Sequence, residues 1–312
     1  GQGAGLHPVS EPETKTVADF LFDRFNIYAV FTFGPQDNLG QPMKASERQT
    51  ESGRQNQETG QGFTRMQRTR VTSILKSDET INRLVSDKYH SITGLKGSPA
   101  PVTEPGNFME WAYYHYGRYS FSTPGWWFTT EKGRNPGAEL LKQAGEGKSS
   151  ELFVPWTATN HPDFPGKIVE VGGLKPYVMI NPPADSLPGL IGSHYKFITE
   201  VAAMHPELEF LDVKTENAGE NVFRLSLKVH NKGLFATCAE IGDQNIWTRI
   251  MRISIEPSKG QTILSGLKVQ RIQRLQGDES AEFSWLISGK GSVSISAGSD
   301  AAGTISLPVG LK

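Results

Sequence analysis

The sequence lacks most features that would mark a disulfide-rich, membrane-spanning or nucleic-acid-binding protein. A single cysteine among 312 residues excludes an internal disulfide framework and a cysteine zinc site. That residue, Cys238, lies in the alternating segment LFATCAEI, which favours a small buried hydrophobe over a nucleophile. No apolar run approaches the about 18 residues that a bilayer crossing needs, so we expect no membrane span. The net charge of −1 gives no electrostatic basis for binding nucleic acid.

The remaining composition is that of a globular chain. Hydrophobic residues make up 37% and charged residues 21% of the sequence, which is long enough for two domains. Glycine is frequent, at 33 residues, and in the last quarter of the chain it accompanies serine and alternating Val, Ile and Leu. This pattern favours a β-rich C-terminal region.

The first part of the chain, residues 1–150, begins with a helix pattern followed by a strand pattern. The segment SEPETKTVADFLFDRF opens with a capping box of Ser10 and Glu13 and continues with apolar residues at helical spacing. A predicted buried strand, NIYAVFTF, follows it and stops at Gly34.

The same region then repeats this order of elements. After a polar excursion over 41–62, helical spacing returns at 63–90. The aromatic segment EWAYYHYGRYSFSTPGWWF, residues 110–128, passes from a helix into a strand that ends at Pro124. Helices and strands that alternate in this way predict an α/β fold for residues 1–150.

The rest of the chain changes character twice. Residues 151–207 carry many turn signals and predict a linker with short strands and one helix, at 190–204. From residue 208 to 312, short alternating strands follow one another without helices between them. This spacing predicts an all-β, immunoglobulin-like sandwich after the α/β part.

Two segments of the α/β part resemble the zinc carboxypeptidase family, the metallocarboxypeptidases of the carboxypeptidase A type. The segment SEPETKTVADFLFDRFNIYAVFTFG is similar to a family helix and strand whose last residue, a histidine, binds zinc. The segment YSFSTPG is similar to the strand that ends in the family's catalytic glutamate. The resemblance covers residues 5–130 and implies the C-terminal half of a catalytic domain with a mixed sheet, the first half lying outside this chain.

The chain departs from the family at both chemical positions. The zinc-ligand position is Gly34, which has no side-chain donor, and the general-base position is Pro124, which has no proton acceptor in its side chain. None of the seven histidines has a glutamate three residues later, so the family's His-x-x-Glu pair is also missing. We therefore expect no catalytic residue, no metal ligand and no cofactor in this chain.

Three residues after the first strand are candidates for a rebuilt site. Gln36, Asp37 or Asn38 would replace the lost ligand, Asp37 by its carboxylate. The alternative is a strand-ending turn in which these side chains cap backbone groups. The sequence leaves both interpretations open.

Aromatic residues around the second strand are candidates for a ligand pocket. Ligands gather outside the carboxyl ends of strands in open α/β sheets. Tyr119, Trp126 and Trp127 would line such a pocket for a peptide or a sugar. The alternative is that these rings form the buried floor of the sheet and its contact with the next domain.

The function that we expect is that of a carboxypeptidase-like module, a pseudoenzyme that has lost zinc chemistry. It would bind a peptide, a glycan or a protein partner, or serve a structural role, and would be inactive by itself. The alternative is a divergent zinc metallocarboxypeptidase whose metal ligands lie in a missing N-terminal half. Zinc is a cofactor only under that alternative.

A half sheet exposes an edge, which proteins normally cover. We therefore expect an N-terminal half-domain or a second chain to cover it as a partner. The resemblance further implies a bacterial protein that is secreted, periplasmic or on the cell surface.

Overall fold

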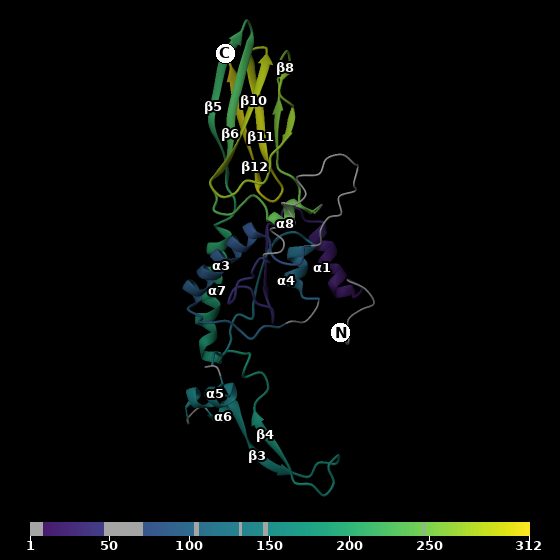
Figure 1. The fold of residues 1–312 in the computed structure, drawn as a ribbon, viewed down its shortest axis with the longest axis vertical. Coiled ribbons are helices and arrows are strands. Elements are labelled where there is room, and N and C mark those ends of the chain that lie inside the picture. The colour runs from purple at the N-terminus through teal and green to yellow at the C-terminus, as the bar shows by residue number, and fades with distance from the viewer. Residues whose placement is uncertain (1–8, 47–70, 103–105, 131–132, 146–148, 246) are drawn as a thin grey trace.

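The computed structural model describes residues 9–46, 71–102, 106–130, 133–145, 149–245 and 247–312. The molecule is elongated, with a β region at one end, a mixed body of helices and strands in the middle and a hairpin at the other end (Figure 1). None of the described helices combines the length and the hydropathy that crossing a bilayer requires.

The body is built around two parallel strands. Its elements are α1 (Pro12–Phe22), β1 (Ala29–Phe33), α3 (Lys76–Thr93), α4 (Phe108–Tyr114), β2 (Tyr119–Thr123) and α7 (Leu187–Ala202). β1 and β2 pair in register from Ala29 opposite Tyr119 to Phe33 opposite Thr123. All residues of β2 are buried, whereas those of β1 are partly buried or exposed. The predicted mixture of helices and strands is confirmed, and β2 is the more deeply buried of the two strands.

The first helix starts differently from the prediction. The capping box of Ser10 and Glu13 is not formed, because α1 begins at Pro12 and its N-cap is Glu11. Glu11 makes no side-chain cap hydrogen bond, and proline occupies the first turn, where its missing N–H costs nothing. Ser10 is therefore one residue too early to cap the helix.

The second helix is also shorter than its pattern. The prediction placed helical structure over 63–90, but α3 begins at Lys76, and residues 63–70 lie outside the described residues. Asp78 and Glu79 lie in its first turn, where carboxylates stabilise the positive end of the helix dipole.

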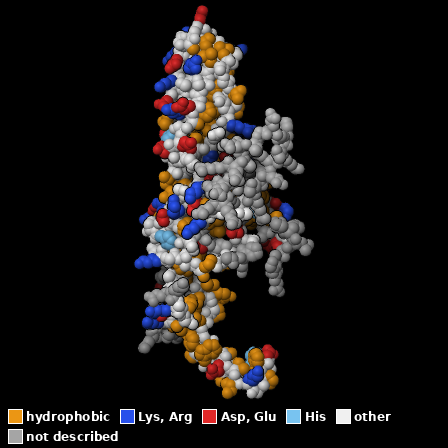
Figure 2. Space-filling view, in the orientation of Figure 1, with side chains coloured by type: hydrophobic (Ala, Val, Ile, Leu, Met, Phe, Trp, Pro, Cys, Tyr) orange, Lys and Arg blue, Asp and Glu red, His pale blue; other side chains and the backbone are white. Residues whose placement is uncertain are grey.

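A projecting hairpin, called the arm, lies between β2 and α7. The elements of this stretch are α5 (Pro136–Ala144), α6 (Ser149–Leu152), β3 (Phe153–Thr159), β4 (Val169–Leu174) and the 3-10 helix η2 (Ala184–Ser186). In the arm, β3 and β4 form a two-stranded antiparallel sheet. A Cβ on Gly172 would lie 2.7 Å from the Trp156 Cα, so this close approach requires glycine. Trp156 is nevertheless 59% exposed, and Figure 2 shows further hydrophobic side chains along the arm.

The C-terminal β region consists of two four-stranded antiparallel sheets. One has the order β5 (Leu208–Gly219), β6 (Val222–Asn231), β10 (Glu279–Ser288) and β8 (Thr262–Ser265). The other has the order β12 (Gly303–Leu311), β11 (Gly291–Ser299), β7 (Arg252–Glu256) and β9 (Val269–Arg271).

Alternate residues of both sheets form one hydrophobic core. Leu225 and Leu227 of β6 are buried together with Ile253 and Ile255 of β7 and with Trp285 of β10. This is the period of two expected of strands with one buried face. The predicted all-β C-terminal region with antiparallel strands is confirmed.

Two helices cap each other where the body meets the β region. The short helix α8 (Glu240–Asp243) follows β6. Asp78 of α3 accepts hydrogen bonds from the N–H groups of Glu240 (2.7 Å) and Ile241 (3.1 Å) and from the Tyr113 hydroxyl (2.8 Å). In return, the Glu240 carboxylate accepts the N–H of Ser77 at 3.0 Å. Each carboxylate thus satisfies free N–H groups at the other helix's start.

Arg274, in the segment after β9, reinforces this junction. Its Nε donates to the Cys238 carbonyl at 2.7 Å and its Nη2 to the Ser77 hydroxyl at 2.9 Å. Nη2 also lies 3.7 Å from Asp78 Oδ1, and both side chains are buried. The body and the β region are therefore joined by a buried ion pair and by hydrogen bonds.

Candidate functional site

The carboxyl ends of β1 and β2 lie side by side. The N–H of Gly34, the residue after β1, donates to the carbonyl of Thr123, the last residue of β2, at 3.0 Å. Gly34 and Pro124 are therefore neighbours at this edge. The strand ends are the natural place for a site in a sheet of this kind.

A chain of hydrogen bonds lies at the carboxyl ends of β1 and β2, and the donor and the acceptor of each bond can be assigned. The carbonyl of Leu190 lies 2.8 Å from His194 Nδ1, and because a carbonyl only accepts, this nitrogen carries the proton. In the neutral imidazole the other nitrogen, Nε2, is then the acceptor, and the Tyr89 hydroxyl donates to it at 3.0 Å. The Tyr89 oxygen accepts from Thr123 Oγ1 at 3.1 Å, and Thr123 Oγ1 accepts the Gly125 N–H at 3.1 Å.

Burial defines the chemistry of this hydrogen-bond chain. Tyr89, Thr123 and His194 are all buried. Desolvation raises the pKa of Tyr89 to about 12, which opposes ionisation of the phenol, although its bond to Thr123 acts in the other direction. Each hydroxyl and each ring nitrogen already has a partner, so the three side chains connect α3, β2 and α7.

Aromatic rings cover the hydrogen-bond chain. The Phe33 ring centroid lies 5.4 Å from that of His194, and the Trp127 ring stacks on Tyr89 at 6.3 Å. Gly125 has a φ of +78°, and a Cβ there would lie 3.2 Å from the Phe33 ring. Glycine is thus required after Pro124 for Phe33 to pack in this way.

The residues at the strand ends do not fit a zinc ion. Gly34 and Pro124 have no donor side chains, and both nitrogens of His194 are engaged, by Leu190 and Tyr89. In the described part of the chain, no three His, Cys, Asp or Glu side chains are grouped to hold a metal ion. We therefore derive no metal-dependent step at this position.

In the turn after β1, side-chain and backbone groups are paired with each other or with β2. Asp37 accepts the N–H groups of Gly40 and Gln41, both at 2.9 Å, and burial raises the pKa of this carboxyl. Gln36 contributes its carbonyl, which accepts from the Ser122 hydroxyl at 2.9 Å. These are the contacts of a capped turn.

Asn38 replaces a missing neighbour strand along the outer edge of β2. Its side chain accepts the Ser122 N–H (2.8 Å) and donates to the Ser120 carbonyl (2.8 Å), while its own N–H donates to the Ser122 carbonyl (3.0 Å). Asn82 of α3 then donates to the Asn38 carbonyl at 3.1 Å. One buried amide therefore satisfies the peptide groups of this edge of β2.

The three candidate aromatic residues do not share a pocket. Tyr119 is at the start of β2, where its hydroxyl lies 3.4 Å from the Cys238 carbonyl at the junction. Trp127 follows the end of β2, and its indole N–H donates to the Lys96 carbonyl at 3.0 Å. Trp126 beside it is partly buried.

Sequence reasoning did not bring Tyr89 and His194 together at this site. Their apolar helix patterns could be read from the sequence, but their contact could not, because 105 positions separate the two residues. The one usable signal was a histidine and a tyrosine at core positions of their helices. Buried polar side chains need partners, so each pointed to a hydrogen-bonding neighbour.

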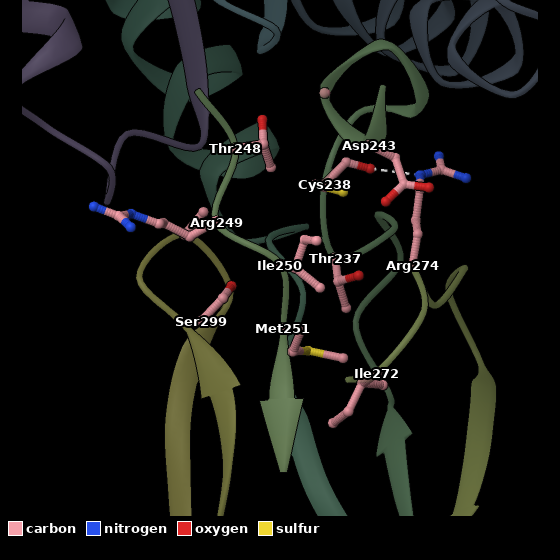
Figure 3. A pocket seen from close by; sticks show the side chains of 12 residues that line it. Thr237, Cys238, Asp243, Thr248, Arg249, Ile250, Met251, Ile272, Arg274 and Ser299 are labelled. Carbon is pink, nitrogen blue, oxygen red and sulfur yellow. Dashed lines mark hydrogen bonds between the residues drawn. The ribbon is translucent and has the colours of Figure 1, made fainter. Parts of the chain in front are cut away.

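A small hollow lies at the junction of the body and the β region (Figure 3). Its volume of about 20 Å³ has room for roughly one water molecule. Cys238 and Arg274 line it together with Thr248 and Met251. Burial raises the pKa of the Cys238 thiol to about 12, which keeps it protonated and a poor nucleophile.

The C-terminal region matches a family model described as a domain of unknown function, DUF8731, over residues 207–309. No curated protein matches the chain. Similar solved structures include β-glucosidase 3B from Thermotoga neapolitana, at 16% identity and a TM-score of 0.19 over 34% of this chain and 16% of that one. A β-glucosidase from Bifidobacterium adolescentis has 14% identity and a TM-score of 0.19 over 34% and 17%. Such low scores carry no inference about function.

Proposed function

We propose that this chain is a carboxypeptidase-like module without zinc chemistry that acts by binding a partner. The observation that supports it is the hydrogen-bond chain at the strand ends. Thr123, Tyr89 and His194 satisfy one another where a hydrolytic site would need free donors and acceptors. None of these three side chains is a free base that could take a proton from a water molecule.

The proposal extends to the C-terminal β region, which we interpret as an immunoglobulin-like sandwich. Two antiparallel four-stranded sheets over one core support this interpretation. In the proposal, the β region orients the body, because Arg274 and Asp78 fix one against the other.

A hydrolysis assay with the whole chain tests the proposal. N-blocked dipeptides with C-terminal Phe, Arg or Glu are incubated with the protein, with and without added zinc chloride. We expect no release of the C-terminal amino acid above the buffer rate. Zinc-dependent release that a His194→Ala variant loses would refute the proposal.

A second candidate function is favoured by the single neighbour of β1. A parallel sheet of two strands is unusual, and β1 pairs with β2 alone in the described part of the chain. A further half-domain at this edge would supply the ligands of a divergent zinc metallocarboxypeptidase. Expressing the chain joined to its upstream coding region and assaying the same dipeptides distinguishes the two candidates.

A further inference from the structure

His90, in the last turn of α3, has both ring nitrogens against carbonyl oxygens. Its Nδ1 lies 2.7 Å from the Leu95 carbonyl oxygen, and its Nε2 lies 3.0 Å from that of Gly40. A carbonyl only accepts, whereas a neutral imidazole donates from one nitrogen and accepts at the other. A neutral His90 would therefore hold a nitrogen lone pair against a carbonyl oxygen. Both contacts are hydrogen bonds only when both nitrogens carry protons, which is the imidazolium.

The surroundings of this ring favour a cation. The carboxyl end of a helix is the negative end of its dipole, and α3 ends just after His90, with Gly94 as its C-cap. The Asp37 carboxylate accepts the N–H of Gly40, whose carbonyl faces the ring. Burial raises the pKa of the Asp37 carboxyl, and the His90 charge acts in the opposite direction, so the two charges attract each other.

The other charged or titratable side chains near the ring do not oppose this cation. They are Lys96 in the segment after α3, and Asp87, Lys88 and Tyr89 on α3 itself. Asp87 and Lys96 are exposed to solvent, which screens their charges. Lys88 is paired with Glu200 of α7 at 2.6 Å, and the Tyr89 phenol stays protonated because burial raises its pKa to about 12.

The imidazole joins two pieces of chain that pack on each other. One is the turn after β1, and the other is the segment of residues 95–99 that follows α3. A Cβ on Gly40 of the turn would lie 3.0 Å from Pro99 Cδ and 3.2 Å from Ser98 Cα, so the two pieces are in direct contact. The turn is also held to α3 independently of the imidazole, because the Ser86 hydroxyl donates to the Leu39 carbonyl at 2.7 Å.

The segment depends more strongly on His90 than the turn does. Leu95 is bonded to α3 by the contact of its carbonyl with His90 and by a longer bond, 3.3 Å, from its N–H to the Thr93 hydroxyl. When the ring is neutral, either the Leu95 carbonyl loses its donor, or the ring is repelled from the Gly40 carbonyl and carries Leu95 with it. The turn keeps its bond to Ser86 in both cases, so the segment is the part that moves.

The segment in turn holds an aromatic ring that covers the hydrogen-bond chain at the strand ends. The Lys96 carbonyl accepts the indole N–H of Trp127 at 3.0 Å and the Thr129 hydroxyl at 3.3 Å. Trp127 is buried, and its ring stacks on that of Tyr89, a member of the hydrogen-bond chain. A shift of Lys96 therefore changes how Trp127 covers this chain.

We propose that His90 is a pH switch that controls the cover of the strand ends. As an imidazolium it ties residues 95–99 to the turn after β1 and keeps Trp127 closed over Tyr89. When the ring gives one proton to solvent, the segment moves away from the turn and Trp127 loosens. The strand ends are therefore closed at lower pH and opened at higher pH.

This inference concerns the free chain and does not depend on the proposed function. Without such a switch, the proposal of a binding module that lacks zinc chemistry would still stand. Conversely, hydrolysis of the dipeptides would refute that proposal and leave the switch untouched.

The first measurement is a pH titration of the whole chain by nitrogen-15 NMR, from about pH 5 to about pH 9, which brackets the titration of an ordinary histidine. At the acidic end both His90 nitrogens should carry protons. Loss of one proton should shift the Trp127 indole N–H resonance with the same midpoint, because its bond to Lys96 opens. Its exchange with water should rise at least about tenfold relative to that of the Trp285 indole. The Trp285 indole donates to the Leu267 carbonyl at 2.9 Å inside the β region, and its resonance should not shift.

Two variants test whether His90 is responsible. His90→Gln has no group that titrates at this position in the same pH range, so the Trp127 indole resonance should show no transition. His115→Gln replaces an exposed histidine at the end of α4 and is the matched control, which should keep the transition of the wild type. A Trp127→Phe variant assigns the indole resonance.

Three results would overturn the inference. The first is a His90 ring with a single proton at the acidic end of the titration. The second is a Trp127 resonance that stays unchanged while His90 loses its proton. The third is a Trp127 transition that persists in His90→Gln, because another group would then cause it. If His90→Gln fails to fold, as judged by circular dichroism, His90→Lys takes its place. It keeps a cation that does not titrate in this range, and it should also lack the transition.

Discussion

Asn38 and Tyr89 are buried polar residues whose hydrogen bonds join segments that are distant in sequence. Asn38 bonds to Ser120 and Ser122, while Tyr89 bonds to Thr123 and His194. A buried polar group stabilises a fold when every donor and acceptor has a partner and destabilises it when one is lost. Both residues are therefore positions where a small substitution should have a large effect.

Asn38→Ala should lower the free energy of unfolding by about 3 kcal/mol, because it leaves the peptide groups of Ser120 and Ser122 buried without partners. Urea denaturation measures the change. Asn217→Ala, which removes one exposed turn hydrogen bond to Gly219, is the control and should cost less than about 1 kcal/mol. Similar losses for both variants would contradict the role assigned to Asn38.

Tyr89→Phe should make stability less sensitive to alkaline pH. The pKa of tyrosine is about 10 in an unfolded chain, and in the folded protein that of Tyr89 is raised to about 12. Between these values the unfolded chain loses a proton that the folded chain keeps, so stability falls as pH rises. Unfolding free energies of the wild type should therefore fall more steeply from pH 10 to 12 than those of Tyr89→Phe. Parallel curves for the two proteins would refute this.

The sequence predicted only some of the residues whose hydrogen bonds stabilise the fold. The sequence identified Gln36, Asp37 and Asn38 as polar residues after a strand, and capping was one of the two interpretations. It could not show that Asn38 acts on Ser122, because 84 positions separate the two residues. Local patterns report a residue's own element, whereas a hydrogen bond to another element depends on the tertiary fold.

At the scale of elements, the position of α3 against α8 depends on contacts between the helix ends as much as on packing between apolar faces. The starts of α3 and α8 exchange carboxylates, with Asp78 bonded to the N–H of Glu240 and Glu240 to the N–H of Ser77. Free N–H groups and the helix dipole make both contacts favourable. Arg274 adds a counter-charge to Asp78 inside the junction.

Asp78→Asn should destabilise the protein by about 3 kcal/mol, because Arg274 would remain buried beside a neutral amide. Chemical denaturation is the measurement. Asp87→Asn, at an exposed position of the same helix, changes the net charge equally and should shift stability by no more than about 0.5 kcal/mol. If both variants lose the same stability, net charge and not the junction is responsible.

The elements themselves were easier to predict than their ends. β1, β2 and α7 were predicted because their apolar residues follow the period of a strand or a helix. The start of α1 was misplaced because a Ser and a Glu at capping-box spacing do not decide which residue is the N-cap. The arm was predicted only as short strands in a linker. Most residues of β3 and β4 are exposed, so the sequence pattern could not indicate a surface against which these strands pack.

At the scale of the whole molecule, the junction makes the body and the β region one mechanical unit. Arg118 is buried in the body, and its guanidinium donates to the Trp247 carbonyl (2.9 Å) and the Thr248 hydroxyl (2.8 Å) of the segment before β7. Arg274 makes the reverse connection, from the β region to α3. Interfaces within a chain that are buried and hydrogen-bonded suppress relative motion.

The wild-type protein should therefore unfold in a single transition, seen equally by calorimetry and by tryptophan fluorescence. Trp127 reports on the body and Trp285 on the core of the β region. Arg274→Met removes the junction's ion pair and should separate the transitions of the two parts, whereas Arg271→Met at an exposed site of β9 should not. A wild type that already unfolds in two steps would show that the parts are independent.

The most direct test of the account is the state of the His194 ring in the presence of zinc. Nitrogen-15 NMR of the whole chain should show the proton on Nδ1 and a hydrogen-bonded, unprotonated Nε2, and excess zinc chloride should leave both resonances unchanged. A partly exposed histidine in the same spectrum, His161, is the internal control for adventitious binding. A zinc-induced shift of His194 Nε2 at stoichiometric metal would contradict a closed hydrogen-bond chain at the strand ends.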